Sequence, residues 1–233
     1  MLLGKITSKI YNGRANNAFR NGNIPETLSW LEKSYKTGCA KPKVVTTYGY
    51  MLLKYGHLEE AKKILKEQLE ASGLSNSDYY NARSNYALVL WKQDQLDKAV
   101  EMFEDTIKNF KNTNIYGSLG YLYILQGDLE KALKFNLEAY EYNSTGGVIL
   151  DNLGQTYYLM GDYENGEKTF SALMAVNPKF PEAYYDYALL HEKTGNREKC
   201  IEMLKNALKY ETNYLSAITS EDIQKKLDEL NNV

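Results

Sequence analysis

A stretch of about 34 residues occurs twice in the middle of the chain. When residues 115–132 are aligned with residues 149–166, the two copies share a Leu-Gly pair, a tyrosine and a Gly-Asp pair. In the first copy these are Leu119-Gly120, Tyr123 and Gly127-Asp128. A fixed period of this length, with two helical segments joined by a Gly-Asp turn, is typical of an array of stacked helical hairpins and not of a single globular core.

The pattern extends outward to six units, at about 8–41, 42–75, 80–112, 113–146, 147–180 and 181–214. The eighth position of every unit is small: Ala15, Gly49, Ala87, Gly120, Gly154 and Ala188. The twentieth position is also small: Thr27, Ala61, Ala99, Ala132, Gly166 and Cys200. Small side chains are expected there if the paired helices cross closely, because a larger one would overpack the contact at a cost of about 1–3 kcal/mol.

A third column marks the turn between the two helices of each unit. It consists of Gly22, Gly56, Asp94, Gly127, Gly161 and Gly195. Glycine permits the left-handed backbone conformation that commonly ends a helix. Asp94 is the one exception, and aspartate is among the few other residues that tolerate this conformation.

These columns resemble the tetratricopeptide repeat family, whose 34-residue unit has Leu-Gly at positions 7 and 8, Tyr at 11 and Ala at 20. The resemblance covers roughly residues 8–214 and implies an all-α fold, a right-handed superhelical solenoid of six helix-turn-helix repeats. We expect residues 1–214 to form the array and residues 215–233 to form a C-terminal capping helix. Asn136 departs from the family pattern, since it occupies a core position that is usually apolar, and the first unit is the poorest match.

Two segments lie outside the regular repeat. Residues 219–222 resemble a helix start, and Ile223, Leu227 and Leu230 follow at helical spacing, as expected for a helix that covers the last repeat. An insertion at residues 75–78 separates the second and third units. We expect a longer loop there, with Ser77 or Asp78 capping the next helix; a hinge is the alternative.

The sequence offers little chemistry for catalysis. Cys39 and Cys200 lie in different repeats, without a partner at metal-ligand spacing, which favours a reducing, cytoplasmic location. His191 occupies a core column, and the repeat places nothing acidic beside it. We therefore expect no enzyme activity, no cofactor and no metal site.

The resemblance implies a concave groove lined by positions 2, 5, 6, 9, 12 and 13 of each first helix. Asp151 and Asp186 occupy two of these positions. Asn85 and Asn152 could each bond a peptide backbone through donor and acceptor together, although some of the aromatic residues could pack between helices instead. The predicted peptide-binding residues are Tyr50, Asn85, Trp91, Tyr121, Asn152, Gln155, Tyr158 and Tyr185.

The predicted function is a non-enzymatic scaffold that binds a protein or peptide partner in this groove. Residues 1–54 carry nine Lys and Arg against two Glu, a net of +7, which leaves −9 for the remainder. Attachment to a membrane surface through the basic N-terminal helix, where Leu2, Leu3, Ile6 and Ile10 alternate with lysines, is one alternative. The favoured interpretation of that segment is a cap on the first unit, because every such array needs one. RNA binding is a weaker one, because the chain has no basic stripe, and we expect no nucleic-acid partner. We expect no transmembrane segment, and self-association is possible.

Overall fold

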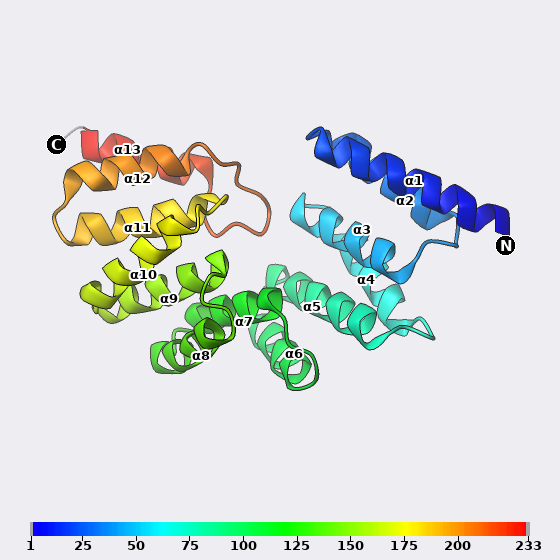
Figure 1. The fold of residues 1–233 in the computed structure, drawn as a ribbon, viewed down its shortest axis with the longest axis horizontal. Coiled ribbons are helices and arrows are strands. Elements are labelled where there is room, and N and C mark those ends of the chain that lie inside the picture. Colours follow the sequence, from blue (N-terminus) through cyan, green and yellow to red (C-terminus); the bar gives the residue numbers. More distant parts are fainter. Residues whose placement is uncertain (1, 232–233) are drawn as a thin grey trace. The chain divides into compact units, whose positions relative to one another are not determined.

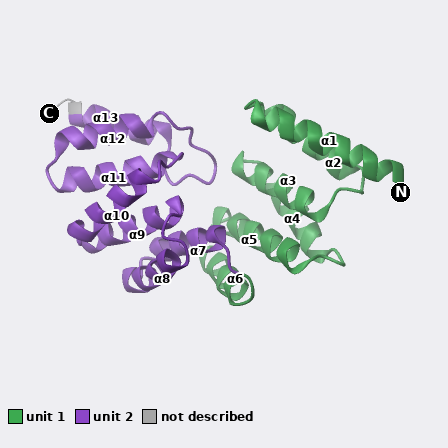
Figure 2. Cartoon of the chain, in the orientation of Figure 1, with its two compact units in different colours: residues 1–110 green, residues 111–233 purple. Residues whose placement is uncertain are grey.

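The structure, a computed structural model, describes residues 2–231, and every regular element in that range is an α-helix. The chain divides into two compact units, unit 1 at residues 1–110 and unit 2 at residues 111–233 (Figure 2). The predicted all-α fold of paired helices is confirmed. The units are described one at a time.

Unit 1 contains three helix pairs (Figure 1). In chain order its helices are α1 (Leu2–Arg20), α2 (Ile24–Lys36), α3 (Pro42–Lys54), α4 (Leu58–Glu70), α5 (Asn76–Lys92) and α6 (Leu96–Asn109).

Unit 2 contains three further pairs and one additional helix (Figure 1). Its helices are α7 (Thr113–Gln126), α8 (Leu129–Tyr142), α9 (Gly147–Met160), α10 (Tyr163–Ala175), α11 (Pro181–Lys193), α12 (Arg197–Ala207) and α13 (Ser220–Asn231). The first helices of successive pairs contact one another, α7 with α9 and α9 with α11.

The turn within each pair stops one helix and starts the next. All six residues of the turn column have positive φ, including Asp94 at 59°, which confirms the prediction. In four pairs an Asn or Asp follows and caps the second helix; Asp128 Oδ1, for example, accepts a hydrogen bond of 3.0 Å from the Lys131 N–H. Such a cap contributes about 1 kcal/mol, which explains why Gly-Asp recurs in the sequence.

The small columns lie where the paired helices meet. All twelve of their residues are buried, as predicted. A Cβ added at Gly154 would lie 2.8 Å from Phe170 Cε1, and one added at Gly49 would lie 2.6 Å from Leu65 Cγ. The eighth position of a unit therefore receives the large side chain at the twenty-fourth position of the same unit.

The end of unit 2 is covered by α13. Ile223 and Leu227 are buried in a core cluster with Leu190 and Leu204, and Leu230 packs against it. The predicted start is confirmed: the Thr219 hydroxyl accepts from the Asp222 N–H at 3.1 Å, while the Asp222 carboxylate accepts from the Thr219 N–H at 2.9 Å. This helix supplies the apolar cover that a terminal repeat needs.

The insertion at residues 75–78 does not form the longer loop that was expected. Residues 76–78 form the first turn of α5, which is 17 residues long. The N-cap is Ser75, whose hydroxyl accepts from the Asp78 N–H at 3.1 Å, and not Ser77 or Asp78 as expected. The extra residues extend a helix because Ser75 caps it early.

Two expectations from the sequence concern His191, a polar residue of the core. His191 is buried as expected and packs against Tyr187 in a tilted arrangement, with ring centroids 4.2 Å apart. The expectation that nothing acidic lies beside it is wrong, since its Nδ1 is 3.8 Å from Glu167 Oε2. Burial lowers the pKa of His191, so the ring is held in its neutral form.

The outer side of α1 is apolar and exposed. Leu2, Leu3, Ile6 and Ile10 expose 75%, 78%, 50% and 51% of their surface, while the helix packs on α2 through Ser8, Ala15 and Ala18. Among the helices that the structure describes, none is both long enough and apolar enough to span a bilayer.

Candidate functional site

The eight predicted binding residues fall on first helices in both units. Three lie in unit 1, Tyr50 on α3 and Asn85 and Trp91 on α5. The other five lie in unit 2 on α7, α9 and α11: Tyr121, Asn152, Gln155, Tyr158 and Tyr185.

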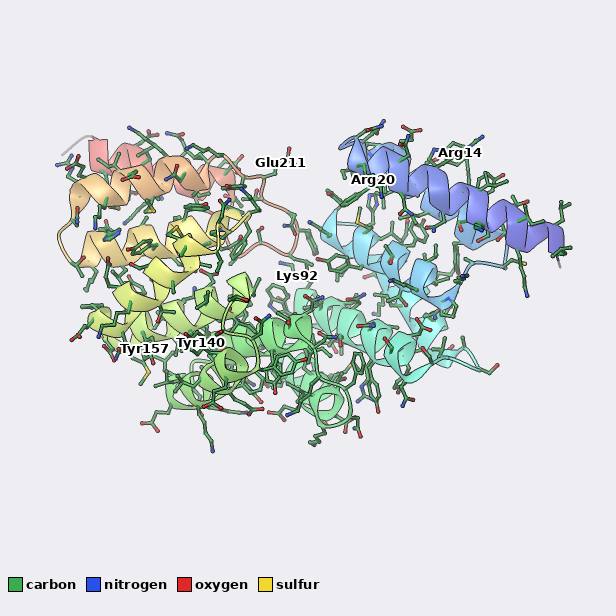
Figure 3. All side chains as sticks on the ribbon, in the orientation of Figure 1. Arg14, Arg20, Lys92, Tyr140, Tyr157 and Glu211 are labelled. Atoms are coloured by element: carbon green, nitrogen blue, oxygen red, sulfur yellow. The ribbon has the colours of Figure 1, made fainter. Side chains whose placement is uncertain are left out.

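The three residues of unit 1 are all half-buried. Lys92, labelled on α5 in Figure 3, places its Nζ 4.6 Å from the centre of the Trp91 ring. Burial lowers the pKa of Lys92, and burial also raises the pKa of Tyr50. These side chains are therefore partly buried but still reach solvent, so a partner could contact them.

In unit 2 the three predicted tyrosines, Tyr121, Tyr158 and Tyr185, are likewise half-buried, as is Gln155. Burial, followed by the charges of Asp186, Glu182 and Asp151, raises the pKa of Tyr121 to about 12. We define the α7–α9–α11 face as Asp186, the side chains of these three helices that interact with it electrostatically, and Gln155, which lies one turn beyond Asp151. It consists of Tyr121, Asp151, Gln155, Tyr158, Glu182, Tyr185 and Asp186.

Asn152 requires a correction, because it is used inside the protein. It is only 3% exposed, and its Nδ2 donates a hydrogen bond of 2.7 Å to the Gly117 carbonyl on α7. Its backbone carbonyl accepts from the Thr156 hydroxyl at 2.6 Å. The side chain therefore holds α9 against α7. It is not available to bind a peptide backbone, contrary to the prediction.

Asn136, the departure from the family pattern, belongs to the same buried polar group. It is fully buried on α8, and its Nδ2 donates to the Thr156 hydroxyl at 3.1 Å. Its Oδ1 has no hydrogen-bond partner in the described chain and lies against Gly120, where a Cβ would collide with it. An amide at this core position thus joins the second helix of one pair to the first helix of the next.

The Asn152–Gly117 bond also reveals the register of the first helices. The two residues are 35 positions apart; Gly117 is at position 5 of its unit and Asn152 at position 6 of the next. One repeat later the same relation joins Asp151 on α9 to Asp186 on α11. The repeat therefore brings two acidic residues into the place that a carbonyl and an amide occupy one unit earlier.

Asp151 and Asp186 are both buried, with 7% and 8% of their surface exposed. Burial raises the pKa of Asp151 well above its ordinary value, and Asp186 and Glu182 raise it further. Burial, with a further contribution from Glu182, raises the pKa of Asp186 to about 7. Asp151 Oδ1 has no hydrogen-bond partner among the described residues, so the charged form of this pair is poorly stabilised in the free protein.

One lysine lies near the edge of this face. Lys226 Nζ on α13 is 2.7 Å from Glu192 Oε1 on α11, and the two form an ion pair. The charge of Lys226 lowers the pKa of Tyr158 and Tyr185 against the larger effect of burial. The charged groups that act on Asp151, by contrast, are the acidic Asp186 and Glu182.

The acidic pair was only partly predictable. Both aspartates occupy predicted groove positions, but the sequence analysis did not pair them. The available signal was the register, since position 5 of one unit lies beside position 6 of the next. Within residues 2–231, no group of three or more His, Cys, Asp or Glu is arranged to hold a metal ion.

Comparison with known proteins agrees with this architecture. Two family models described as tetratricopeptide repeat match the chain, one at residues 86–146 and the other at residues 149–180 and 181–214. Together these matches cover more than half of the chain.

Two curated relatives show the extent of the sequence similarity. A TPR repeat-containing protein of Methanocaldococcus jannaschii is 28% identical over 123 residues, which are 52% of this chain and 22% of the relative. Tetratricopeptide repeat protein 6 of Homo sapiens is 27% identical over 164 residues, 70% of this chain and 31% of the relative. The chain thus spans less than a third of the length of these relatives.

Solved structures share the fold at low sequence identity. A thermophilic TPR protein of Thermus thermophilus aligns with a TM-score of 0.67 at 17% identity, covering 83% of this chain and 100% of that one. PilF of Pseudomonas aeruginosa aligns with a TM-score of 0.64 at 10% identity, covering 96% and 99%.

Proposed function

The chain belongs to the tetratricopeptide repeat family, and on that premise we propose that it is a scaffold that binds an extended segment of a partner protein on the α7–α9–α11 face. The observation that carries the proposal is a set of half-buried tyrosines around two buried aspartates, one of which has no hydrogen-bond partner for its Oδ1 among the described residues. Buried polar groups without partners are rare in folded proteins. On this face Asp151 Oδ1 is such a group, and its presence among the tyrosines favours a role in binding.

The tyrosines supply the contact area. Tyr121, Tyr158 and Tyr185 come from three different helices and are partly held by their neighbours. Aromatic side chains with few rotatable bonds lose little entropy when a ligand covers them, and tyrosine is enriched at interface hot spots. Gln155 offers a side-chain amide beside them, with both a donor and an acceptor for a peptide backbone.

Selection of binding peptides from a displayed library of random peptides, each about 12 residues long to span several repeats in extended form, tests this function on the full chain. Tyr158→Ala removes a ring from the proposed face, and Tyr140→Ala is the matched control, since Tyr140 lies on the second helix α8 and is 38% exposed. We expect Tyr158→Ala to weaken a selected peptide at least about tenfold, as a hot-spot residue does, and Tyr140→Ala to leave the affinity unchanged. Equal effects of the two substitutions would contradict the proposal.

In unit 1, Tyr50, Asn85 and Trp91 stay predicted contacts of the partner. They are half-buried, and the aromatic ring of Trp91 is already covered on one side by Lys92. Trp91→Ala in the same peptide assay tests them separately from unit 2.

A second candidate function is attachment to an anionic membrane surface through α1. The exposed residues Leu2, Leu3, Ile6 and Ile10 fall within an arc of about 100° on an ideal helix of about 3.6 residues per turn. Exposed Lys5, Lys9 and Arg14 flank this arc, and Arg14 and Arg20 are labelled along α1 in Figure 3. An apolar stripe bordered by cations fits the boundary between the headgroups and acyl chains of an anionic bilayer.

Sedimentation with vesicles of phosphatidylcholine and phosphatidylserine tests this attachment. We expect Ile6→Asp to abolish sedimentation, whereas Phe19→Asp, which changes an exposed residue on the other side of α1, should not. Dimerisation without vesicles that is lost in Ile6→Asp would instead assign the stripe to a second copy of the chain and overturn the membrane proposal.

A further inference from the structure

We propose that the partner segment presents a cationic side chain, Lys or Arg, that binds between Asp151 and Asp186 on the α7–α9–α11 face. This inference rests on the proposed function and specifies the chemistry of the partner. It assigns the two aspartates as specificity-determining residues, and the tyrosines around them as the walls that cover the stem of the cationic side chain.

The first step of the argument is the unsatisfied carboxylate. Asp151 is more than nine-tenths buried, and its Oδ1 has no hydrogen-bond partner in the described part of the chain. Asp186 and Glu182 of α11 act on this carboxyl group electrostatically, and it acts in turn on Tyr121 of α7, so it lies within electrostatic range of both neighbouring first helices. A buried charge without a partner is costly, and a cation with N–H donors satisfies both the charge and the hydrogen bond.

The second step concerns the cations of the chain itself. Lys226 forms an ion pair with Glu192 and exerts its effect on Tyr158 and Tyr185, at the edge of the face. The groups that act on Asp186 and on Asp151 are acidic. A cation from a partner would therefore supply the counter-charge that stabilises the ionised form of the pair.

The third step selects an organic cation. Divalent metal ions such as Ca²⁺ take six or more oxygen ligands, whereas the described residues hold no group of three acidic or other ligating side chains arranged for a metal. An ammonium or guanidinium group instead donates several hydrogen bonds to two carboxylates. Its aliphatic stem can lie against the rings of Tyr121, Tyr158 and Tyr185, as long cationic side chains do on apolar surfaces.

The same displayed library of random peptides tests this chemistry. Selections are run in parallel on the unmodified chain, on the double variant Asp151→Asn/Asp186→Asn and on Asp228→Asn. Asp228 is an exposed carboxylate on α13 and provides the matched loss of charge. We expect the unmodified chain and Asp228→Asn to enrich peptides with Lys or Arg at one fixed position, and the double variant to lose this preference.

A selected peptide is then resynthesised with norleucine in place of its fixed Lys. We expect its affinity for the unmodified chain to fall at least about tenfold, because the carboxylates of Asp151 and Asp186 are then buried without a cation to pair with. Peptides that bind the face, as judged by Tyr158→Ala, but carry no fixed Lys or Arg would overturn the cationic partner and leave the proposed function intact. Failure to select any peptide that Tyr158→Ala weakens would overturn both.

Discussion

Asp186 stands in the same relation to Asp151 as Asn152 does to Gly117: 35 residues later in the chain and on the next first helix. At the earlier position an amide donates to a carbonyl at 2.7 Å, and the contact stabilises the stack. At the later position two buried carboxyl groups influence each other electrostatically, and both of their pKa values are raised. Residues arranged for function often lower the stability of the free protein. We infer that the buried acidic pair does so.

Asp186→Asn should therefore stabilise the free protein, and more at pH 8 than at pH 5. The pKa of Asp186 is about 7 in the folded chain against an ordinary value of 3.8, so the folded state binds more protons between these values. Stability then falls as the pH rises from 3.8 to about 7. Asparagine avoids this loss, and each unit of pKa displacement corresponds to about 1.4 kcal/mol.

Thermal unfolding at the two pH values measures this effect. Since 1 kcal/mol corresponds to about 2–4 °C for a chain of this size, we expect a rise in Tm of several degrees at pH 8. Asp228→Asn, on the exposed side of α13, should change Tm little. A lower Tm for Asp186→Asn at pH 8 would show that the buried carboxylate is stabilised from within the protein.

Asn152→Ala should destabilise unit 2 and not act primarily on binding. The substitution leaves the Gly117 carbonyl without its donor inside the stack, and an unsatisfied buried group costs about 1–3 kcal/mol. Urea unfolding measures the loss. Gln155→Ala, one turn further along α9 and half-buried, is the control and should leave the stability within about 0.5 kcal/mol.

Gly49→Ala should destabilise unit 1 by about 1–3 kcal/mol, because the new Cβ would lie 2.6 Å from Leu65 Cγ and overpack the contact between α3 and α4. Gly13→Ala, in the exposed part of α1 where nothing lies within 4 Å of the new Cβ, should instead be neutral or stabilising by up to about 1 kcal/mol. Chemical denaturation of both variants provides the comparison. Similar effects of the two substitutions would argue against close crossing of the helices at the small columns.

His191 should make unit 2 sensitive to mild acid. Its pKa is lowered by burial from an ordinary 6.5, so the unfolded state binds more protons below pH 6.5. Its contribution to stability is complete above pH 6.5 and is lost as the pH falls through the lower folded pKa. Between pH 7 and pH 5, His191→Gln should lose less stability than the unmodified chain in urea unfolding. His57→Gln is the control, since it also removes a histidine. An equal dependence of unfolding free energy on pH in His191→Gln and in the unmodified chain would contradict this prediction.

The sequence predicted the packing better than the site. The small columns and the turn column were predictable because steric exclusion and positive φ each restrict a position to a few residue types. Asp94 shows how specific this restriction is, since its φ of 59° follows from its place in the column. The start of α5 was not predicted, because Ser75, Ser77 and Asp78 are all good caps and only the fold decides among them.

The site was harder to predict because polar side chains at groove positions have two possible partners. An amide such as Asn152 can face a peptide or a neighbouring carbonyl, and Gly117 decides the outcome by leaving its carbonyl accessible to the next helix. The acidic pair depends on two residues in different repeats. Its recognition requires the 35-residue register, which the Asn152–Gly117 contact provides.

A double-mutant cycle tests the central claim most directly. Calorimetric affinities are measured for a selected Lys peptide and its norleucine counterpart, each with the unmodified chain and with Asp186→Asn, at pH 8, where the folded carboxyl is mainly ionised. Residues in direct contact typically show coupling energies of about 0.5–3 kcal/mol. We predict that replacing the lysine costs much less affinity once Asp186 is asparagine, whereas additive losses would contradict the contact between the partner's cation and the acidic pair.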